Sequence, residues 1–220
     1  MRNTTPSFLA LGTLIVGAAL GGCTAQGLYE PAYLSNVVPP YLAENKVVVL
    51  MHEQDQQYTF TGRPVSAIGE NITLTMPIGA ILREVAASTF RSYFMYGTVF
   101  TDNLSPNLLY TVAIEPEIRN FQYSYEREFQ EDVLDMRSND DGLTRQPLST
   151  ITPSLKFALD VRAYDGMGKV LFAKTYDSGV IQGESYIVTS RPHERVNATV
   201  HRALEQLMLK VADDIRPYLA

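Results

Sequence analysis

Apolar residues recur along the chain with two different periods, and the changes of period mark the expected elements. Residues 46–51 form a short β-branched run typical of a buried strand, and residues 71–75 have the pattern of a half-buried one. Between Pro77 and residue 96 the apolar positions fall three or four residues apart, which predicts a helix whose first turn accommodates the proline. Residues 98–100 then favour extended backbone.

The middle of the chain predicts one long strand with a bulge. Residues 109–119 alternate apolar and polar side chains, as in a strand with one buried face. The alternation slips by one residue at Asn120, after which Phe121, Tyr123 and Tyr125 are the apolar set. Because one inserted residue moves every later side chain to the other face, the slip indicates a β-bulge.

Residues 126–153 do not continue this alternation. They hold an acidic cluster at residues 126–135, followed by the turn-rich segment Ser138-Asn139-Asp140-Asp141-Gly142. Such a composition is typical of solvated, turn-forming chain. We therefore expect a long polar insertion at about 126–153.

The remainder of the chain predicts a hairpin, one further strand and a terminal helix. Alternating residues 155–161 and 170–176 flank the turn residues 165–168, and the further strand is expected near residues 180–188. The helix has apolar residues three or four positions apart: Val196, Val200, Leu204, Leu207, Met208, Val211 and Ile215. Together these elements predict a single α+β domain over residues 46–220, in which an antiparallel sheet packs two helices.

Residues 1–22 have the order of a secretory signal. Arg2 precedes an apolar stretch from Phe8 to Leu20, and no acidic residue occurs before Glu30. This stretch of about 13 residues is shorter than the roughly 20 that a membrane-spanning helix needs. We therefore expect the segment to be cleaved and not to remain as a membrane span.

The segment Leu20-Gly21-Gly22-Cys23 resembles the lipobox of bacterial lipoproteins. The resemblance implies that Cys23 becomes the first mature residue and carries a diacylglycerol and an N-linked acyl chain, with no other cofactor. An ordinary cleavage site beside an incidental cysteine is the alternative. Thr24 follows where an aspartate would imply the inner membrane, so the family pattern implies a lipid anchor on the periplasmic face of the outer membrane.

Composition narrows the range of partners. The 220 residues carry a formal net charge of −6 and no basic run, which argues against nucleic acid as a partner. Cys23 is the sole cysteine, so no disulfide within the chain is expected. Residues 23–45 contain Pro31, Pro39 and Pro40 without periodicity, which predicts a lipidated N-terminus and an extended linker.

The order of the expected elements resembles the YajG-type outer-membrane lipoproteins. The resemblance is carried by Ile72-Thr73-Leu74-Thr75 running into the helix of residues 77–96, by the hairpin and by the terminal amphipathic helix. The same β-α-β-β-β-α order is similar to the amino-terminal domain of the periplasmic translocation protein TolB. The resemblance implies an envelope protein with an envelope protein as partner, and the insertion at 126–153 departs from the family pattern.

No motif makes a coherent catalytic or metal site. The helix segment His193-Glu194-Arg195-Val196-Asn197 lacks the second histidine of a zinc-protease helix, and His201 follows roughly 12 Å beyond His193 along the axis. We therefore expect no catalytic residues and no metal ligands, with His201 on the solvent side of its helix. Carboxylates such as Glu115, Glu117 and Asp160 are expected on the wet face of the sheet.

Three functions stay open. The first is a non-catalytic accessory or interaction protein in envelope assembly or transport, with Phe121, Tyr123 and Tyr125 as contact candidates; packing inside the sheet is the alternative for these rings. The second is a lipid-binding, transport-auxiliary lipoprotein with an apolar cavity. The third is a cell-wall hydrolase that uses paired carboxylates. The lack of a catalytic constellation favours the first.

Overall fold

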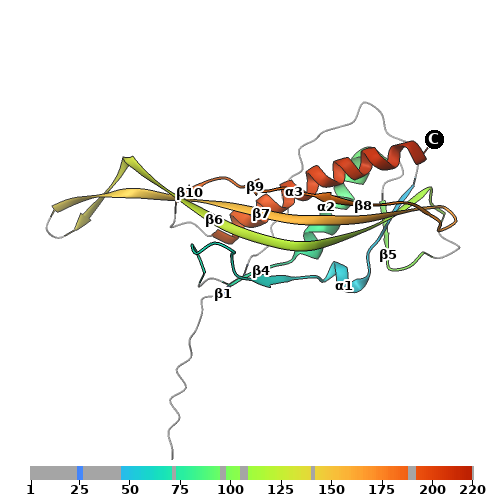
Figure 1. The fold of residues 1–220 in the computed structure, drawn as a ribbon, viewed down its shortest axis with the longest axis horizontal. Coiled ribbons are helices and arrows are strands. Elements are labelled where there is room, and N and C mark those ends of the chain that lie inside the picture. Colours follow the sequence, from blue (N-terminus) through green and yellow to red (C-terminus); the bar gives the residue numbers. More distant parts are fainter. Residues whose placement is uncertain are drawn as a thin grey trace, which may run out of the picture.

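The computed structural model describes residues 24–26, 46–70, 73–94, 98–104, 109–139, 142–187 and 192–219, with backbone alone at 24–26, 130–148 and 192–194. The predicted signal and Cys23 lie outside these residues, as does most of the predicted linker. The described chain is α+β (Figure 1), with two sheets and two main helices.

Seven strands form the larger sheet, and its two longest strands form a single hairpin at its centre. The order is β10 (Tyr186–Ile187), β7 (Gly142–Asp165), β6 (Val112–Asn139), β2 (Val47–Leu50) and β5 (Thr98–Thr101). Two further strands, β8 (Val170–Asp177) and β9 (Ile181–Gln182), pair with the same edge of β7 as β10 does.

The sheet is mixed, so the prediction of a purely antiparallel sheet was wrong. Strand β2 pairs in parallel with both β5 and β6, whereas the pairs of β7 are antiparallel. All four residues of β2 are buried, which is characteristic of a parallel strand covered on both faces. Parallel neighbours need a long crossover, and the chain between β2 and β5 supplies one that contains a helix.

A smaller sheet has the order β1 (Thr24–Gln26), β4 (Thr73–Met76) and β3 (Phe60–Gly62). Strand β1 pairs in parallel with β4, with Thr24 opposite Thr73. The start of the predicted linker is therefore part of the folded domain, because it pairs with the edge of β4 that β3 does not occupy. Leu74 and Met76 of β4 are fully buried and tie this sheet to the core.

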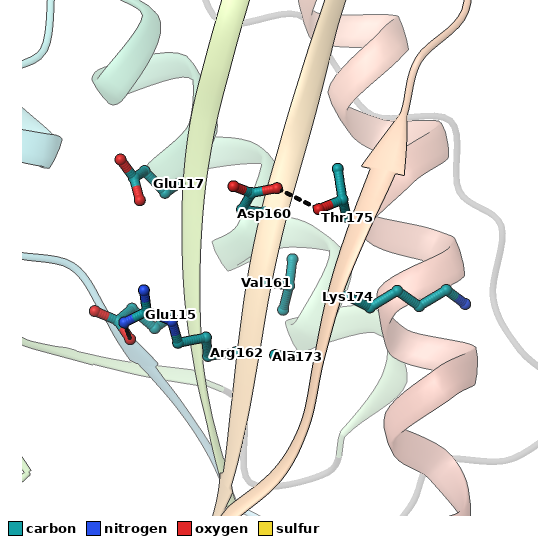
Figure 2. A pocket seen from close by; sticks show the side chains of 8 residues that line it. All are labelled: Glu115, Glu117, Asp160, Val161, Arg162, Ala173, Lys174 and Thr175. Atoms are coloured by element: carbon teal, nitrogen blue, oxygen red, sulfur yellow. Dashed lines mark hydrogen bonds and ion pairs between the residues drawn. The ribbon is translucent and has the colours of Figure 1, made fainter.

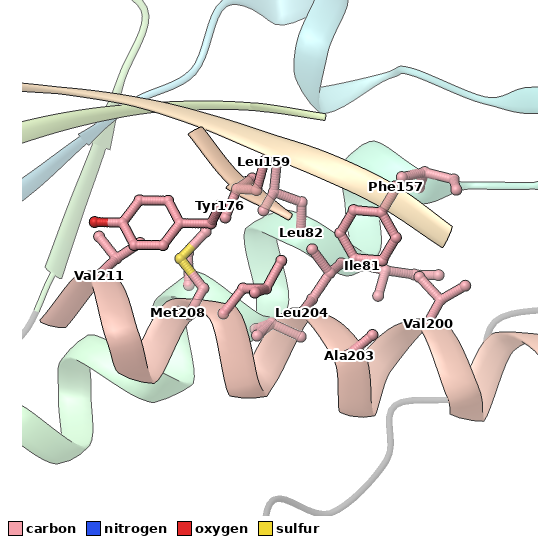
Figure 3. Close-up of a cluster of buried hydrophobic side chains, with 14 of the residues drawn as sticks. Ile81, Leu82, Phe157, Leu159, Tyr176, Val200, Ala203, Leu204, Met208 and Val211 are labelled. Carbon is pink, nitrogen blue, oxygen red and sulfur yellow. The ribbon is translucent and has the colours of Figure 1, made fainter. Parts of the chain in front are cut away.

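The predicted helices are present. A single turn, α1 (Glu53–Gln56), precedes α2 (Ile78–Tyr93), and the chain closes with α3 (Pro192–Ile215) and a 3-10 turn, η1 (Arg216–Tyr218). Helices α2 and α3 pack on one face of the large sheet, where α3 meets β7 and β8 (Figure 3). Leu204 of α3 is fully buried between Phe157 of β7 and α2.

The bulge predicted at Asn120 is confirmed. The pairing of β6 with β7 shifts between Arg119 and Gln122, and Asn120 has φ 54°, the left-handed conformation that asparagine tolerates best after glycine. The shift turns Phe121, Tyr123 and Tyr125 toward the core. The hairpin at residues 165–168 is also confirmed, with Gly168 at φ 81°.

Residues 126–139 and 142–153 lie in β6 and β7 and are extended strand, not irregular insertion. The ladder of β6 and β7 continues from Glu126 opposite Thr152 to Asn139 opposite Gly142, with a second shift between Gln130 and Leu134. We call residues 112–128 and 150–165 the root, and residues 129–139 with 142–149 the arm. In the described chain the arm strands pair only with each other, and the arm extends well past the body (Figure 1).

The strand expected near residues 180–188 is divided into β9 and β10. Gly183 lies between them, where an added Cβ would come within 2.4 Å of the Thr199 hydroxyl and 2.7 Å of the Pro153 side chain. The Gly183 amide donates a hydrogen bond to the Pro153 carbonyl at 2.7 Å. This close approach between the chain and α3 requires glycine, and it interrupts the strand.

Candidate functional site

The helices leave one face of the large sheet uncovered, and this face carries charge. Figure 2 shows β6, β7 and β8 side by side with α2 and α3 behind them. A surface hollow of about 200 Å³ lies over these strands. Its lining residues are Glu115, Glu117, Asp160, Val161, Arg162, Ala173, Lys174 and Thr175. The sequence placed Glu115, Glu117 and Asp160 on the wet face, and this prediction is confirmed.

Two carboxylates on this face stand directly opposite each other. Glu117 of β6 is the register partner of Asp160 of β7, an arrangement that is unfavourable for like charges. Arg119 lies between them, at 2.6 Å from Glu117 and 3.0 Å from Asp160. The hydrogen bond to Glu117 raises the pKa of Arg119. The arginine thus neutralises the repulsion that the strand register creates.

Glu115 is the centre of a second group. The hydroxyl of Tyr164 donates to its carboxylate at 2.5 Å, Arg162 lies 3.5 Å away, and the His52 imidazole lies 3.9 Å away. Burial, followed by the hydrogen bond to Glu115, raises the pKa of Tyr164. The remaining strand carboxylate of β7, Asp165, accepts from the amides of residues 167 and 169 and closes the β7–β8 turn. These carboxylates are engaged in structural contacts.

The rings of Phe121, Tyr123 and Tyr125 are not available as a contact surface. Their exposed fractions are 8, 1 and 4%, so the alternative of packing inside the sheet is the correct one. The Tyr123 hydroxyl donates to the Gly62 carbonyl at 3.0 Å, and burial raises its pKa to about 12. Phe60 of β3 packs on Phe121 with ring centres 4.8 Å apart. The small sheet therefore covers these rings.

The prediction that His201 faces solvent was wrong. His201 is 4% exposed and Asn197, one turn earlier, is 5% exposed. Helix α3 is buried over a wide arc because it contacts β7 on one side and α2 on another. A helix with two packing partners buries positions beside its apolar stripe, and the hydrophobic spacing alone does not mark them. Among residues with described side chains, no group of three His, Cys, Asp or Glu residues is arranged to hold a metal ion.

A groove that the sequence did not indicate runs between α2 and β5. It has a volume of about 490 Å³, and its lining includes Arg83, Glu84 and Arg91 of α2 with Thr98 and Phe100 of β5. The Arg83 guanidinium lies 5.3 Å from the centre of the Phe100 ring. Helical spacing places the two arginines two turns apart, but only the fold brings β5 beside them.

An exposed aromatic ring and several charged residues lie in and beside the arm. At its base Phe129 is 64% exposed, and the Arg127 guanidinium lies 5.6 Å from the centre of its ring. The sequence between residues 129 and 149 has five acidic and two basic residues. All five acidic residues lie between positions 131 and 141. In the described part of the chain, no helix is both long and apolar enough to cross a membrane.

No family model and no curated protein matches the sequence. Similarities to solved structures are at low identity. They include protein XCC0632 of family DUF330 from Xanthomonas campestris (12% identity, TM-score 0.39, covering 89% of this chain and 95% of that one). They also include a candidate homolog of neuraminyllactose-binding hemagglutinin from Helicobacter pylori (8%, TM-score 0.41, 86% and 97%) and a minor lipoprotein from Acinetobacter baumannii (8%, TM-score 0.28, 78% and 91%). Similarities at this level do not define a function.

Proposed function

We propose that this protein is a lipid-anchored, non-catalytic accessory protein of the bacterial envelope that contacts a partner protein through the arm. The lipid anchor rests on the lipobox resemblance at Cys23, and the outer membrane is the expected site. The arm is the observation that supports the contact role. The contact surface is then the hairpin that extends from the body, and not the buried rings of Phe121, Tyr123 and Tyr125.

The arm has no evident purpose in stabilising the domain. Its strands have 11 and 8 residues, and at about 3.4 Å per residue the longer one reaches roughly 35 Å. A two-stranded ribbon alone is only marginally stable in water. The arm therefore adds little to the free energy of unfolding of the domain. A second surface that covers the ribbon would stabilise it, and exposed strand edges recruit such surfaces by pairing with them.

The charge of the arm suggests the chemistry of its partner. Between residues 129 and 149 the sequence has five acidic residues against two basic ones, which favours a basic partner surface and disfavours anionic lipid headgroups. Phe129 adds an exposed ring at the base, where aromatic residues are common in protein interfaces. A protein with a basic groove or a basic strand edge fits these features best.

The other two functions have less support. The hollow over the open sheet face and the hollow beside Glu184 are lined largely by charged side chains, whereas a lipid carrier needs an apolar cavity. The carboxylates of the open sheet face are each bonded to an arginine, a tyrosine or a threonine, which favours a structural role over acid–base chemistry.

Site-specific photo-crosslinking in intact cells tests the proposal. A benzophenone amino acid replaces Phe129 in one variant and Met167, which is 90% exposed in the distant β7–β8 turn, in the matched control. We expect one discrete protein adduct from position 129 and none of the same size from position 167. Replacing residues 131–147 by Asn-Gly in the Phe129 variant should remove the adduct. No adduct, or the same adduct from both positions, would contradict the contact role.

A further inference from the structure

The chain that directly follows Cys23 is fixed to the body of the domain. Thr24, Ala25 and Gln26 pair with Thr73, Leu74 and Thr75 of β4. Consecutive Cα atoms are about 3.8 Å apart, so the residue that bears the predicted lipid lies within one residue of a hydrogen-bonded strand. An anchor at this position leaves no spacer between the acyl chains and the small sheet.

The same end of the small sheet presents a cation and an exposed apolar side chain. Strand β3 is antiparallel to β4 with Gly62 opposite Leu74, so Arg63 follows at the level of Thr73 and Thr24. Two strand spacings of roughly 4.8 Å separate β3 from β1, which puts Arg63 about 10 Å from the chain at Thr24. Arg63 is exposed and forms no ion pair with another described residue. Val65 is 68% exposed.

We propose that this end of the small sheet is a bilayer-contact site, in which Arg63 binds lipid phosphate and Val65 enters the headgroup region. The inference rests on the proposed lipid anchor and adds an orientation to it. A guanidinium is well suited to phosphate, and an apolar side chain beside it gains from leaving water. Each contact is weak by itself, but the acyl chains at Cys23 hold the bilayer close to Arg63, and Val65 follows two residues later in the chain. The effective concentration of lipid at these residues is therefore high.

The contact site is joined rigidly to the start of the arm. The Val65 amide donates to the Tyr123 carbonyl at 2.9 Å, and the Tyr125 amide donates to the Ser66 hydroxyl at 2.9 Å. These bonds fix the loop after β3 to the edge of β6 just before the arm begins. The bilayer therefore orients the arm directly, whereas a flexible linker would leave the arm without a preferred direction.

Fluorescence quenching in vesicles tests the orientation. The full-length lipidated protein is reconstituted in vesicles of phosphatidylethanolamine and phosphatidylglycerol that contain a headgroup-labelled quencher lipid. Because Cys23 is the sole cysteine and is acylated, Val65→Cys or Met167→Cys gives one thiol for an environment-sensitive dye. Position 167 is the matched control, since its turn adjoins Val112 at the opposite end of the root. We expect several-fold stronger quenching at position 65.

Two further variants separate docking from anchoring. About 12 Gly and Ser residues inserted between Cys23 and Thr24 would span roughly 20 Å and free the domain from its anchor. Quenching at position 65 should then fall to the level at position 167, and Arg63→Glu should lower it in the uninserted protein. Equal quenching at positions 65 and 167, or no effect of the insertion, would overturn the inference. Failure of the protein to float with the vesicles would instead refute the anchor of the proposed function, and this inference with it.

Discussion

The root and the arm are parts of the same two strands, yet their surroundings differ completely. In the root one face packs on helices and on the small sheet, and β2, β8, β9 and β10 cover the outer edges. In the arm the described pairing is only between its own two strands. Backbone hydrogen bonds are therefore common to both regions, and the described core residues of these two strands all lie in the root. Apolar burial thus holds the root together, and strand pairing continues beyond it into the arm.

The largest effect is expected where α3 covers the root. Leu204→Asp removes a fully buried side chain, a loss of roughly 1.5–3 kcal/mol, and adds the cost of a buried carboxylate. The lost burial and the buried carboxylate together offset much of a typical free energy of unfolding of about 5–15 kcal/mol. We therefore expect the domain to unfold, as measured by circular dichroism. Gln206→Asp is the matched control, because Gln206 is exposed on the same helix. A folded Leu204→Asp protein would show that the root does not depend on α3.

Alkaline pH should act on the root through its tyrosines. Burial raises the pKa of Tyr123 and of Tyr186 to about 12, and it also raises the pKa of Tyr125 and of Tyr176. Because the folded state favours the protonated phenol, this stabilisation is complete below the ordinary value of 10.0 and is lost as pH rises through the folded pKa values. Ultraviolet absorbance should show these tyrosinates appearing together with unfolding. A gradual titration of all 13 tyrosines near pH 10.0 would contradict their burial.

His201→Ala tests the other side of α3. The side chain is 4% exposed, so its removal leaves a cavity where α3 meets its neighbours. We expect a loss of about 1–3 kcal/mol in the free energy of unfolding, measured in urea. Gln206→Ala, at an exposed position, should change the same free energy little. If both substitutions change the free energy of unfolding equally little, the His201 side chain is exposed to solvent and not buried.

Asn120 tests the bulge that turns the aromatic rings inward. At φ 54° a β-branched residue is strained, so Asn120→Val should cost about 1–2 kcal/mol. Asn120→Gly should be neutral or slightly favourable, since glycine adopts positive φ freely. Thermal melts of the two variants measure the difference. Equal melting temperatures would show that the backbone at this position relaxes without cost.

The smallest effect is expected from removing the arm. Replacing residues 131–147 by Asn-Gly joins Gln130 to Leu148, which already face each other, through a two-residue hairpin turn. Because this removes strand pairing but none of the described core residues, the melting temperature should stay within a few degrees of the wild-type value. Deleting residues 136–150 is the informative contrast, since it removes the whole second arm strand and the end of the first. Residues 129–135 then lose their pairing partners. A large loss on clean arm removal would show that the arm contributes to the root.

The phase of the alternating pattern was sufficient to predict the bulge at Asn120 and the inward turn of the three rings that follow. The same pattern did not predict the pairing in the arm, because alternation reports burial and the sequence of the arm does not alternate. The parallel pairing of β2 was missed for another reason. A short apolar strand does not by itself state the direction of its neighbours, although the run of four consecutive apolar residues at 47–50 was a usable signal of a strand covered on both faces.

The sequence by itself determined the local features of this protein: the lipobox resemblance, the two main helices, the turn at residues 165–168 and the slip at Asn120. These depend on residues close together in the chain. Tertiary structure decided the rest. Only packing brings α3 between β7 and α2 and so buries His201. Only sheet pairing brings Thr24 beside Thr73. Such contacts join segments far apart in sequence, and their free energy depends on which surfaces meet, which no local pattern records.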